Sequence, residues 1–96
     1  MEYIYRISSI NEKERWIYIS SNDEFDLEEP DAFAHLVQRI RRGVSGTIKD
    51  IGNMRYKIEN DELDLIYQWD SCFGITVIYP SDELKDAAKS FLQQFL

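Results

Sequence analysis

The sequence predicts an α+β domain in which two helices pack on one face of an antiparallel sheet of five to six strands. Short segments in which apolar and polar residues alternate are separated by polar or glycine-containing turns, as in a meander. Two other segments place apolar residues three and four apart, the spacing of amphipathic helices. The predicted order is ββαββββα. At 96 residues, 44% of them hydrophobic, the chain suffices for one domain, residues 1–96, and not for two.

The first two predicted strands are residues 2–10 and 15–20. A polar turn at 11–14 joins them, so a β-hairpin is the simplest arrangement. Within the second strand, Trp16 and Tyr18 share one face and two isoleucines occupy the other.

A helix is predicted over residues 30–42. Pro30 suits a first helical turn, and arginines near the far end favour the negative end of the helix dipole before Gly43 ends the helix. One stripe of this helix is apolar: Phe33, Leu36, Val37 and Ile40.

Strand patterns return in the second half of the chain, and the first two of these segments are either two strands or one bent strand. The segments are 46–51, 53–59, 63–70 and 74–79. In the third, Leu65, Tyr67 and Trp69 share a face. Ser81 is the predicted N-cap of a final amphipathic helix that continues to the end of the sequence.

Acidic residues exceed basic ones by 18 to 11, a formal charge of −7. Six of them lie in one stretch: Asp23, Glu24, Asp26, Glu28, Glu29 and Asp31. Five more lie in a second: Glu59, Asp61, Glu62, Asp64 and Asp70. Such a field repels nucleic acid and anionic membranes and speeds encounter with a cationic protein surface. We therefore expect a protein partner, and neither nucleic acid nor membrane.

Cysteine usage and the N-terminus indicate the compartment. The single cysteine, Cys72, excludes an internal disulfide and fits a reducing cytosol. Glu2 stands where a signal peptide needs positive charge, and no run approaches the ~18–20 apolar residues that cross a bilayer. A soluble, cytoplasmic protein is predicted, while the oligomeric state and the reactivity of Cys72 stay open.

The acidic stretch 23–31 has three interpretations. Its carboxylates are ligands that divalent cations accept, but the stretch lacks the glycine and the spacing of an EF-hand loop. It can also be a solvated loop that favours the start of the following helix, or a recognition surface for cations. We favour recognition, and expect neither a metal nor a cofactor.

No catalytic pattern emerges from the remaining polar residues. His35 falls opposite the apolar stripe of its helix, and neither it nor Cys72 stands in a nucleophile signature. Asp64 and Asp70 share a strand face, yet lie roughly 20 Å apart at ~3.3 Å per residue, too far for a glycosidase pair. The glycines are isolated, so no phosphate-binding loop exists. We predict that the protein is not an enzyme.

Eight aromatic residues fall on predicted strands, more than one covered sheet face is expected to absorb. Those on the helix-free face would be exposed, and tyrosine and tryptophan beside acids are typical of binding hot spots. Tyr67 and Trp69 precede the acidic Asp70, so aromatic and acidic residues come together there. The sequence does not say which face is open.

The last third of the chain resembles the small immunity proteins of bacterial toxin systems, such as those of contact-dependent inhibition loci. The resemblance rests on Tyr67-Gln68-Trp69-Asp70, on Phe73-Gly74-Ile75, and on the short amphipathic helix that ends at Leu96. It implies a cognate toxin domain, often a basic nuclease, held inactive in a tight one-to-one complex.

The resulting hypothesis is that the chain binds and neutralises a basic bacterial toxin domain. The predicted contact residues are Asp23, Glu24, Asp26, Glu28, Glu59, Asp61, Glu62, Asp64, Tyr67, Trp69 and Asp70. The alternative is a non-catalytic adaptor or regulatory module unrelated to toxins, and an enzyme is the third possibility.

Overall fold

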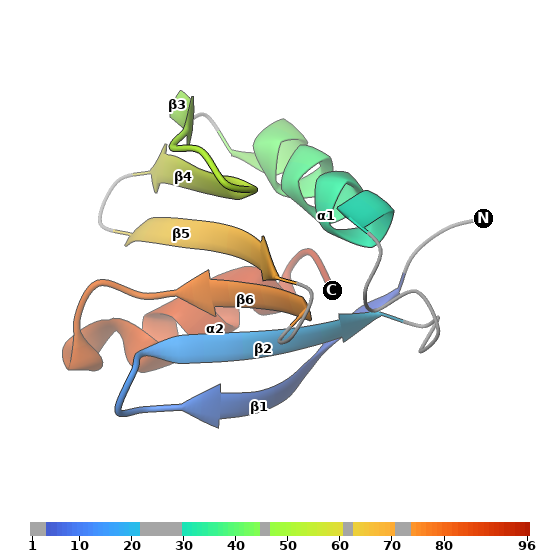
Figure 1. The fold of residues 1–96 in the computed structure, drawn as a ribbon. Helices are drawn as coiled ribbons and strands as arrows, with labels where there is room; N and C mark the ends of the chain where they lie inside the picture. The colour runs from blue at the N-terminus through green and yellow to red at the C-terminus, as the bar shows by residue number, and fades with distance from the viewer. Residues whose placement is uncertain (1–3, 22–29, 45–46, 61–62, 71–73) are drawn as a thin grey trace.

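The computed structural model describes residues 4–21, 30–44, 47–60, 63–70 and 74–96, with the backbone alone at positions 30, 31, 59 and 60. The elements follow the predicted order ββαββββα (Figure 1). They are β1 Tyr5–Asn11, β2 Trp16–Ser21, α1 Pro30–Gly43, β3 Thr47–Asp50, β4 Arg55–Asn60, β5 Leu63–Asp70, β6 Gly74–Ile78, the 3-10 turn η2 Asp82–Leu84, and α2 Lys85–Gln93.

The six strands form one antiparallel sheet in the order β1-β2-β6-β5-β4-β3. The β1–β2 hairpin therefore attaches to the β3–β6 meander through the β2–β6 pair. Residues 47–60 form two paired strands and not one bent strand. Both helices pack on the same face, which confirms the predicted fold class (Figure 1).

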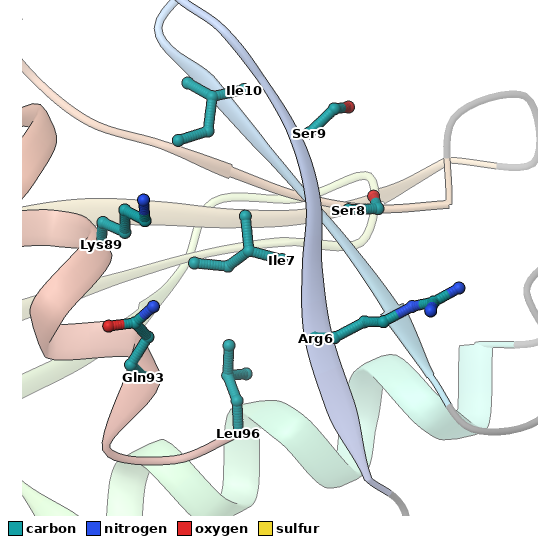
Figure 2. Close-up of a pocket in the computed structure, with 8 residues that line it drawn as sticks. All are labelled: Arg6, Ile7, Ser8, Ser9, Ile10, Lys89, Gln93 and Leu96. Atoms are coloured by element: carbon teal, nitrogen blue, oxygen red, sulfur yellow. The ribbon is translucent and has the colours of Figure 1, made fainter.

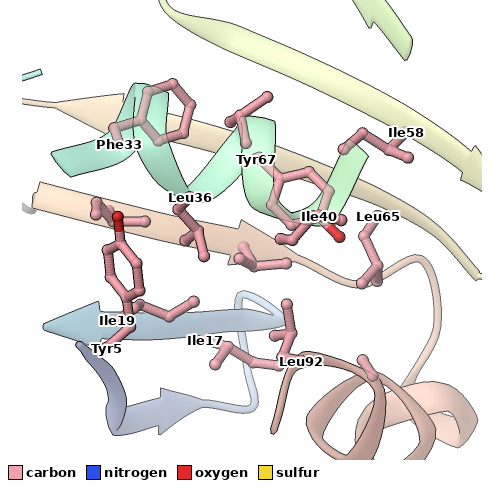
Figure 3. Close-up of a cluster of buried hydrophobic side chains, with 14 of the residues drawn as sticks. Tyr5, Ile17, Ile19, Phe33, Leu36, Ile40, Ile58, Leu65, Tyr67 and Leu92 are labelled. Carbon is pink, nitrogen blue, oxygen red and sulfur yellow. The ribbon is translucent and has the colours of Figure 1, made fainter. Parts of the chain in front are cut away.

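A hydrophobic core fills the space between the sheet and the two helices (Figure 3). Phe33, Leu36 and Ile40 of α1 are fully buried, as their helical spacing predicts, and Leu92 of α2 joins them. Each such side chain contributes about 1.5–3 kcal/mol of burial free energy. The other side of this core comes from the sheet, with Tyr5, Ile17, Ile19, Ile58, Leu65, Tyr67, Ile75 and Val77, and from Tyr79 directly after β6.

Two polar contacts tie the first strand and the end of the chain to α1. The buried hydroxyl of Tyr5 donates a hydrogen bond of 2.6 Å to the carbonyl oxygen of Ala32. The Arg39 guanidinium lies 5.0 Å from the centroid of the Tyr5 ring and donates to the carbonyl oxygen of Phe95 at 2.9 Å. One arginine therefore connects β1, α1 and the segment after α2.

The last helical segment begins after Ser81, as predicted, and its first turn has 3-10 geometry. Ser81 has an extended backbone and its side chain makes no capping hydrogen bond. The chain first makes the 3-10 turn η2, and the α-helix begins at Lys85. Ser81 thus occupies the predicted N-cap position, with Asp82 and Glu83 in the first turn, but this turn is a 3-10 turn and not an α-helical one. Neither described helix combines the length and apolar character needed to span a bilayer.

A β-bulge in β1 is a second departure from simple alternation. The β1–β2 register shifts between Ile7 and Ser9, so Ile7 pairs with Ile19 and Ile10 pairs with Ile17. Both isoleucines of β1 consequently face the helices, although residues three apart in a regular strand point to opposite faces.

Candidate functional site: the helix-free face of the sheet

The sheet face that points away from α1 and α2 is not covered by any described element (Figure 1). Strand pairing defines which residues belong to it, because paired residues of antiparallel strands share a face. We call it the open face. Its central residues are Trp16, Tyr18, Arg55, Lys57, Ile66, Gln68, Thr76 and Ile78, and all are partly exposed except Thr76.

The pairing arranges these residues in two rows that cross the sheet. One row runs Lys49–Lys57–Ile66–Ile78–Trp16 from β3 to β2. The other runs Arg55–Gln68–Thr76–Tyr18 from β4 to β2. The first row begins with two basic residues and the second with one, and each ends with an aromatic residue. We call the part of the two rows on β3 and β4 the basic half and the part on β5, β6 and β2, where Trp16, Tyr18, Ile66 and Ile78 lie, the apolar half.

The two aromatic residues of the apolar half contact each other. The ring centroids of Trp16 and Tyr18 lie 6.1 Å apart at an interplanar angle of 75°, an edge-to-face arrangement. Ile78 is paired with Trp16, and Ile66 with Ile78. These four side chains make a continuous apolar patch that no described helix covers.

Thr76 lies at the centre of the open face and is nevertheless 0% exposed. Its neighbours across the sheet are Tyr18 and Gln68, whose longer side chains flank it. The Thr76 hydroxyl has no hydrogen-bond partner, and the same holds for the buried Nε of Arg55. The middle of this face is therefore close-packed and offers a contact surface without a reactive group.

The predicted aromatic contacts on β5 must be corrected. Tyr67 is 1% exposed and belongs to the core, where burial raises the pKa of its hydroxyl. Trp69 is half-buried against the same core, and its indole N–H is buried without a partner. β5 directs both rings towards the helices, so Trp16 and Tyr18 are the aromatic residues of the open face. Their position opposite the purely aliphatic Ile17 and Ile19 was the sequence signal.

The predicted acidic contacts are only partly within the described residues. Asp64 and Asp70 are exposed on the open side of β5. Glu59 pairs with Asp64 in the β4–β5 register, and only its backbone is described. Six predicted contacts lie outside the described residues: Asp23, Glu24, Asp26, Glu28, Asp61 and Glu62.

The second acidic stretch extends along the whole of β5, so its two ends lie at opposite ends of the sheet (Figure 1). The first stretch follows Ser21 at the end of β2, near the end of β5 at Asp70. Asp61 and Glu62 of the second stretch fall between Asn60 and Leu63, where β4 ends and β5 begins. At ~3.3 Å per residue, the length of β5 separates these ends by roughly 25 Å.

Charge is unevenly divided between the described residues and the rest of the chain. Positions 1–3, 22–29, 45–46, 61–62 and 71–73 contain eight of the eighteen acidic residues and none of the eleven basic ones. The described residues therefore hold ten acids and eleven bases, a formal charge of +1.

The other polar clusters have structural roles. Arg15 binds Asp82 at 3.0 Å and donates to the carbonyl oxygen of Pro80, while Lys85 pairs with Glu12. The hydrogen bond to Glu12 raises the pKa of Lys85. These contacts fasten the β1–β2 turn to η2 and α2.

The catalytic candidates of the sequence were His35 and Cys72. His35 is exposed on α1, as its position opposite the apolar stripe predicts, and Cys72 is outside the described residues. Among the described residues, no three His, Cys, Asp or Glu side chains are grouped closely enough to hold a metal ion.

Comparison with known proteins finds no matching family model, no similar curated protein and no similar solved structure. Function is therefore inferred from the residues of this chain alone.

Proposed function

We propose that this protein is a non-catalytic binding domain that neutralises a cognate, basic bacterial toxin domain by direct contact. The observation that supports it is the apolar patch of Trp16, Tyr18, Ile66 and Ile78 on the open face. None of these four side chains belongs to the buried core on the helix-covered face or packs against it. Aromatic and aliphatic residues that stay partly exposed together on one surface are typical of protein interaction sites.

The acidic segments supply the charge complementarity. A nuclease binds phosphate with lysine and arginine, and carboxylates can occupy those positions. Close charge pairs across interfaces have coupling energies of about 1.5–7 kcal/mol. A standard interface buries about 800 Å² per partner, a square roughly 28 Å on a side. One toxin surface of that size is large enough to reach acids at both ends of the sheet.

The deciding experiment measures binding to the toxin domain encoded by the neighbouring gene. Replacing Asp23, Glu24 and Asp26 with Asn, Gln and Asn removes three charges from the first stretch. We expect binding about tenfold weaker, with a smaller salt dependence, because steering and charge pairing are both reduced. The matched control, Glu14→Gln, Glu83→Gln and Asp86→Asn, changes the net charge equally at exposed positions elsewhere and should retain affinity within about twofold.

Unchanged affinity in the first variant would remove the 23–31 stretch from the interface. A third variant, Glu59→Gln, Asp61→Asn and Glu62→Gln, tests the opposite end of the sheet in the same assay. Weaker binding by both acidic variants indicates a partner that spans the sheet. Weaker binding by only one of them places the partner at the end of the sheet where that variant was changed.

The apolar patch is tested by Trp16→Ala and Tyr18→Ala. Truncation of central aromatic residues in interfaces costs about 2 kcal/mol or more, roughly a thirtyfold loss of affinity. Tyr56→Leu, on the helix-covered side, is the control that alters an aromatic residue without changing the open face. Full inhibition of the toxin by both open-face variants at equimolar concentration contradicts the proposal.

One observation favours the alternative, an adaptor unrelated to toxins. Lys49, Arg55 and Lys57 make half of the open face basic, which complements an acidic surface better than a basic one. The Lys57→Glu variant distinguishes the toxin inhibitor from the adaptor. Tighter binding is expected with a basic toxin, and weaker binding with an acidic partner. Gene context also separates them, since an immunity gene directly follows a large toxin gene.

A further inference from the structure

A groove of about 460 Å³ lies between the edge strand β1 and helix α2, on the side of the sheet opposite the open face (Figure 2). One wall is apolar, because Ile7 and Ile10 point from β1 towards α2 and Leu96 extends the same wall. The facing wall is polar and consists of Lys89 and Gln93 on α2. The volume falls in the range of small-molecule sites, about 300–1,000 Å³.

The β-bulge creates the apolar wall of this groove. In a regular strand Ile7 and Ile10 would point to opposite faces. The register shift between Ile7 and Ser9 turns both towards the helices, where they are only partly buried. The hydroxyl of Ser8, at the bulge, donates to the carbonyl oxygen of Tyr18 at 3.1 Å and holds the irregular segment against β2.

The polar wall presents two hydrogen-bond donors. Lys89 and Gln93 are four residues apart, so they lie on the same side of α2, and both are exposed. Of the two ionisable residues that line the groove, Lys89 is on the groove side and Arg6 points away from it. Lys85, one turn earlier on α2, pairs with Glu12, whereas Lys89 has no carboxylate partner among the residues that the structure describes.

The two walls together define the chemistry of a ligand. The ammonium of Lys89 and the amide N–H groups of Gln93 both donate, which suits the two oxygens and the single negative charge of a carboxylate. The isoleucines and Leu96 offer a surface on which hydrocarbon is removed from water. Because the walls face each other across one groove, a single ligand with a charged head and an apolar tail contacts both.

We propose that this groove binds a free carboxylate with an unbranched hydrocarbon tail. The carboxylate accepts hydrogen bonds from Lys89 and Gln93, and the tail lies along Ile7, Ile10 and Leu96. This site is separate from toxin binding, because it uses the helix-covered side of the sheet and not the open face.

The test titrates the ¹⁵N-labelled protein with sodium octanoate below the concentration at which it forms micelles. Saturable NMR shift changes are expected at the backbone amides of Ile7, Ile10, Lys89 and Gln93. Hexanoate should bind more weakly, since each methylene withdrawn from the groove lowers the affinity by up to about fourfold.

Three variants examine the role of the lysine. Lys89→Met keeps the length of the side chain and removes its charge, so octanoate should bind about tenfold more weakly. Lys89→Arg keeps the charge and should bind within about twofold of the parent protein. Lys13→Met changes the net charge equally at an exposed position in the β1–β2 turn, and it is the matched control that should also bind within about twofold.

A second amphiphile separates charge recognition from general hydrophobic binding. Octyltrimethylammonium has the same tail and the opposite charge, and its binding should not saturate. The proposal is overturned by equal binding of the two amphiphiles, by parent affinity in Lys89→Met, or by octanoate shift changes centred on Trp16 and Tyr18. Co-sedimentation with phosphatidylglycerol vesicles without saturable octanoate binding also overturns it, because the groove would then contact a membrane surface and not a free ligand.

Discussion

The two faces of the sheet are built from the same strands and differ in what covers them. On β5, Leu65 and Tyr67 are each 1% exposed beneath the helices, whereas the intervening Ile66 and Gln68 are partly exposed on the open face. The buried side chains of the covered face stabilise the fold. The open face has similar side chains without a covering layer, which is why we assign binding to it.

Truncating two neighbouring residues of one strand tests most directly whether the two faces differ in burial. Leu65→Ala should lower the free energy of unfolding by about 2–5 kcal/mol, because it leaves a cavity in the core. Ile66→Ala, one residue later on the open face, should cost only about 1 kcal/mol, because little buried volume is lost. Urea unfolding of both variants measures the difference. Equal losses would mean that the open face is covered in the protein.

The burial of Tyr67 on the covered face predicts a loss of stability at alkaline pH. Burial raises the pKa of Tyr67 above its ordinary value of 10.0, so above that pH the folded protein retains a proton that the unfolded chain loses. The contribution of Tyr67 to the free energy of unfolding is therefore constant below about pH 10. Above that pH it falls, by at most about 1.4 kcal/mol per pH unit.

The Tyr67→Phe variant should show a shallower loss of stability between pH 10 and 11 in denaturant titrations. Ile58→Val, which weakens the same core without removing a titrating group, is the control and should keep the parent slope. An unchanged slope in Tyr67→Phe would show that Tyr67 is hydrated and not part of the covered face.

The smallest expected effect concerns the centre of the open face. Thr76 is fully buried there and its hydroxyl is unpaired. Thr76→Val keeps the shape of the side chain and removes the cost of burying an unpaired hydroxyl. The free energy of unfolding should therefore rise by about 1 kcal/mol or less, and this rise is measured as a higher melting temperature. Destabilisation would reveal a hydrogen-bond partner for Thr76 and a more polar surface than we describe.

Much of the fold could be predicted because periodicity is a local property. The stripe of α1 predicted a helix over 30–42, and the structure has it at Pro30–Gly43. The alternation in β5 correctly separated Leu65 and Tyr67 from Ile66 and Gln68. The face of Tyr67 and Trp69 could not be predicted, since alternation defines two faces without showing which one the helices cover.

The sequence by itself determined the elements, their order and the segregation of acids into two stretches, because each follows from spacing and composition along the chain. Tertiary structure decided that Trp16 and Tyr18 face outward and that Tyr67 faces inward. It also brought Asp70 to the end of the sheet where Ser21 precedes the first acidic stretch, and turned Ile7 and Ile10 to the same side through a bulge. These outcomes depend on strand register and on where α1 and α2 pack, which are contacts between residues far apart in the chain.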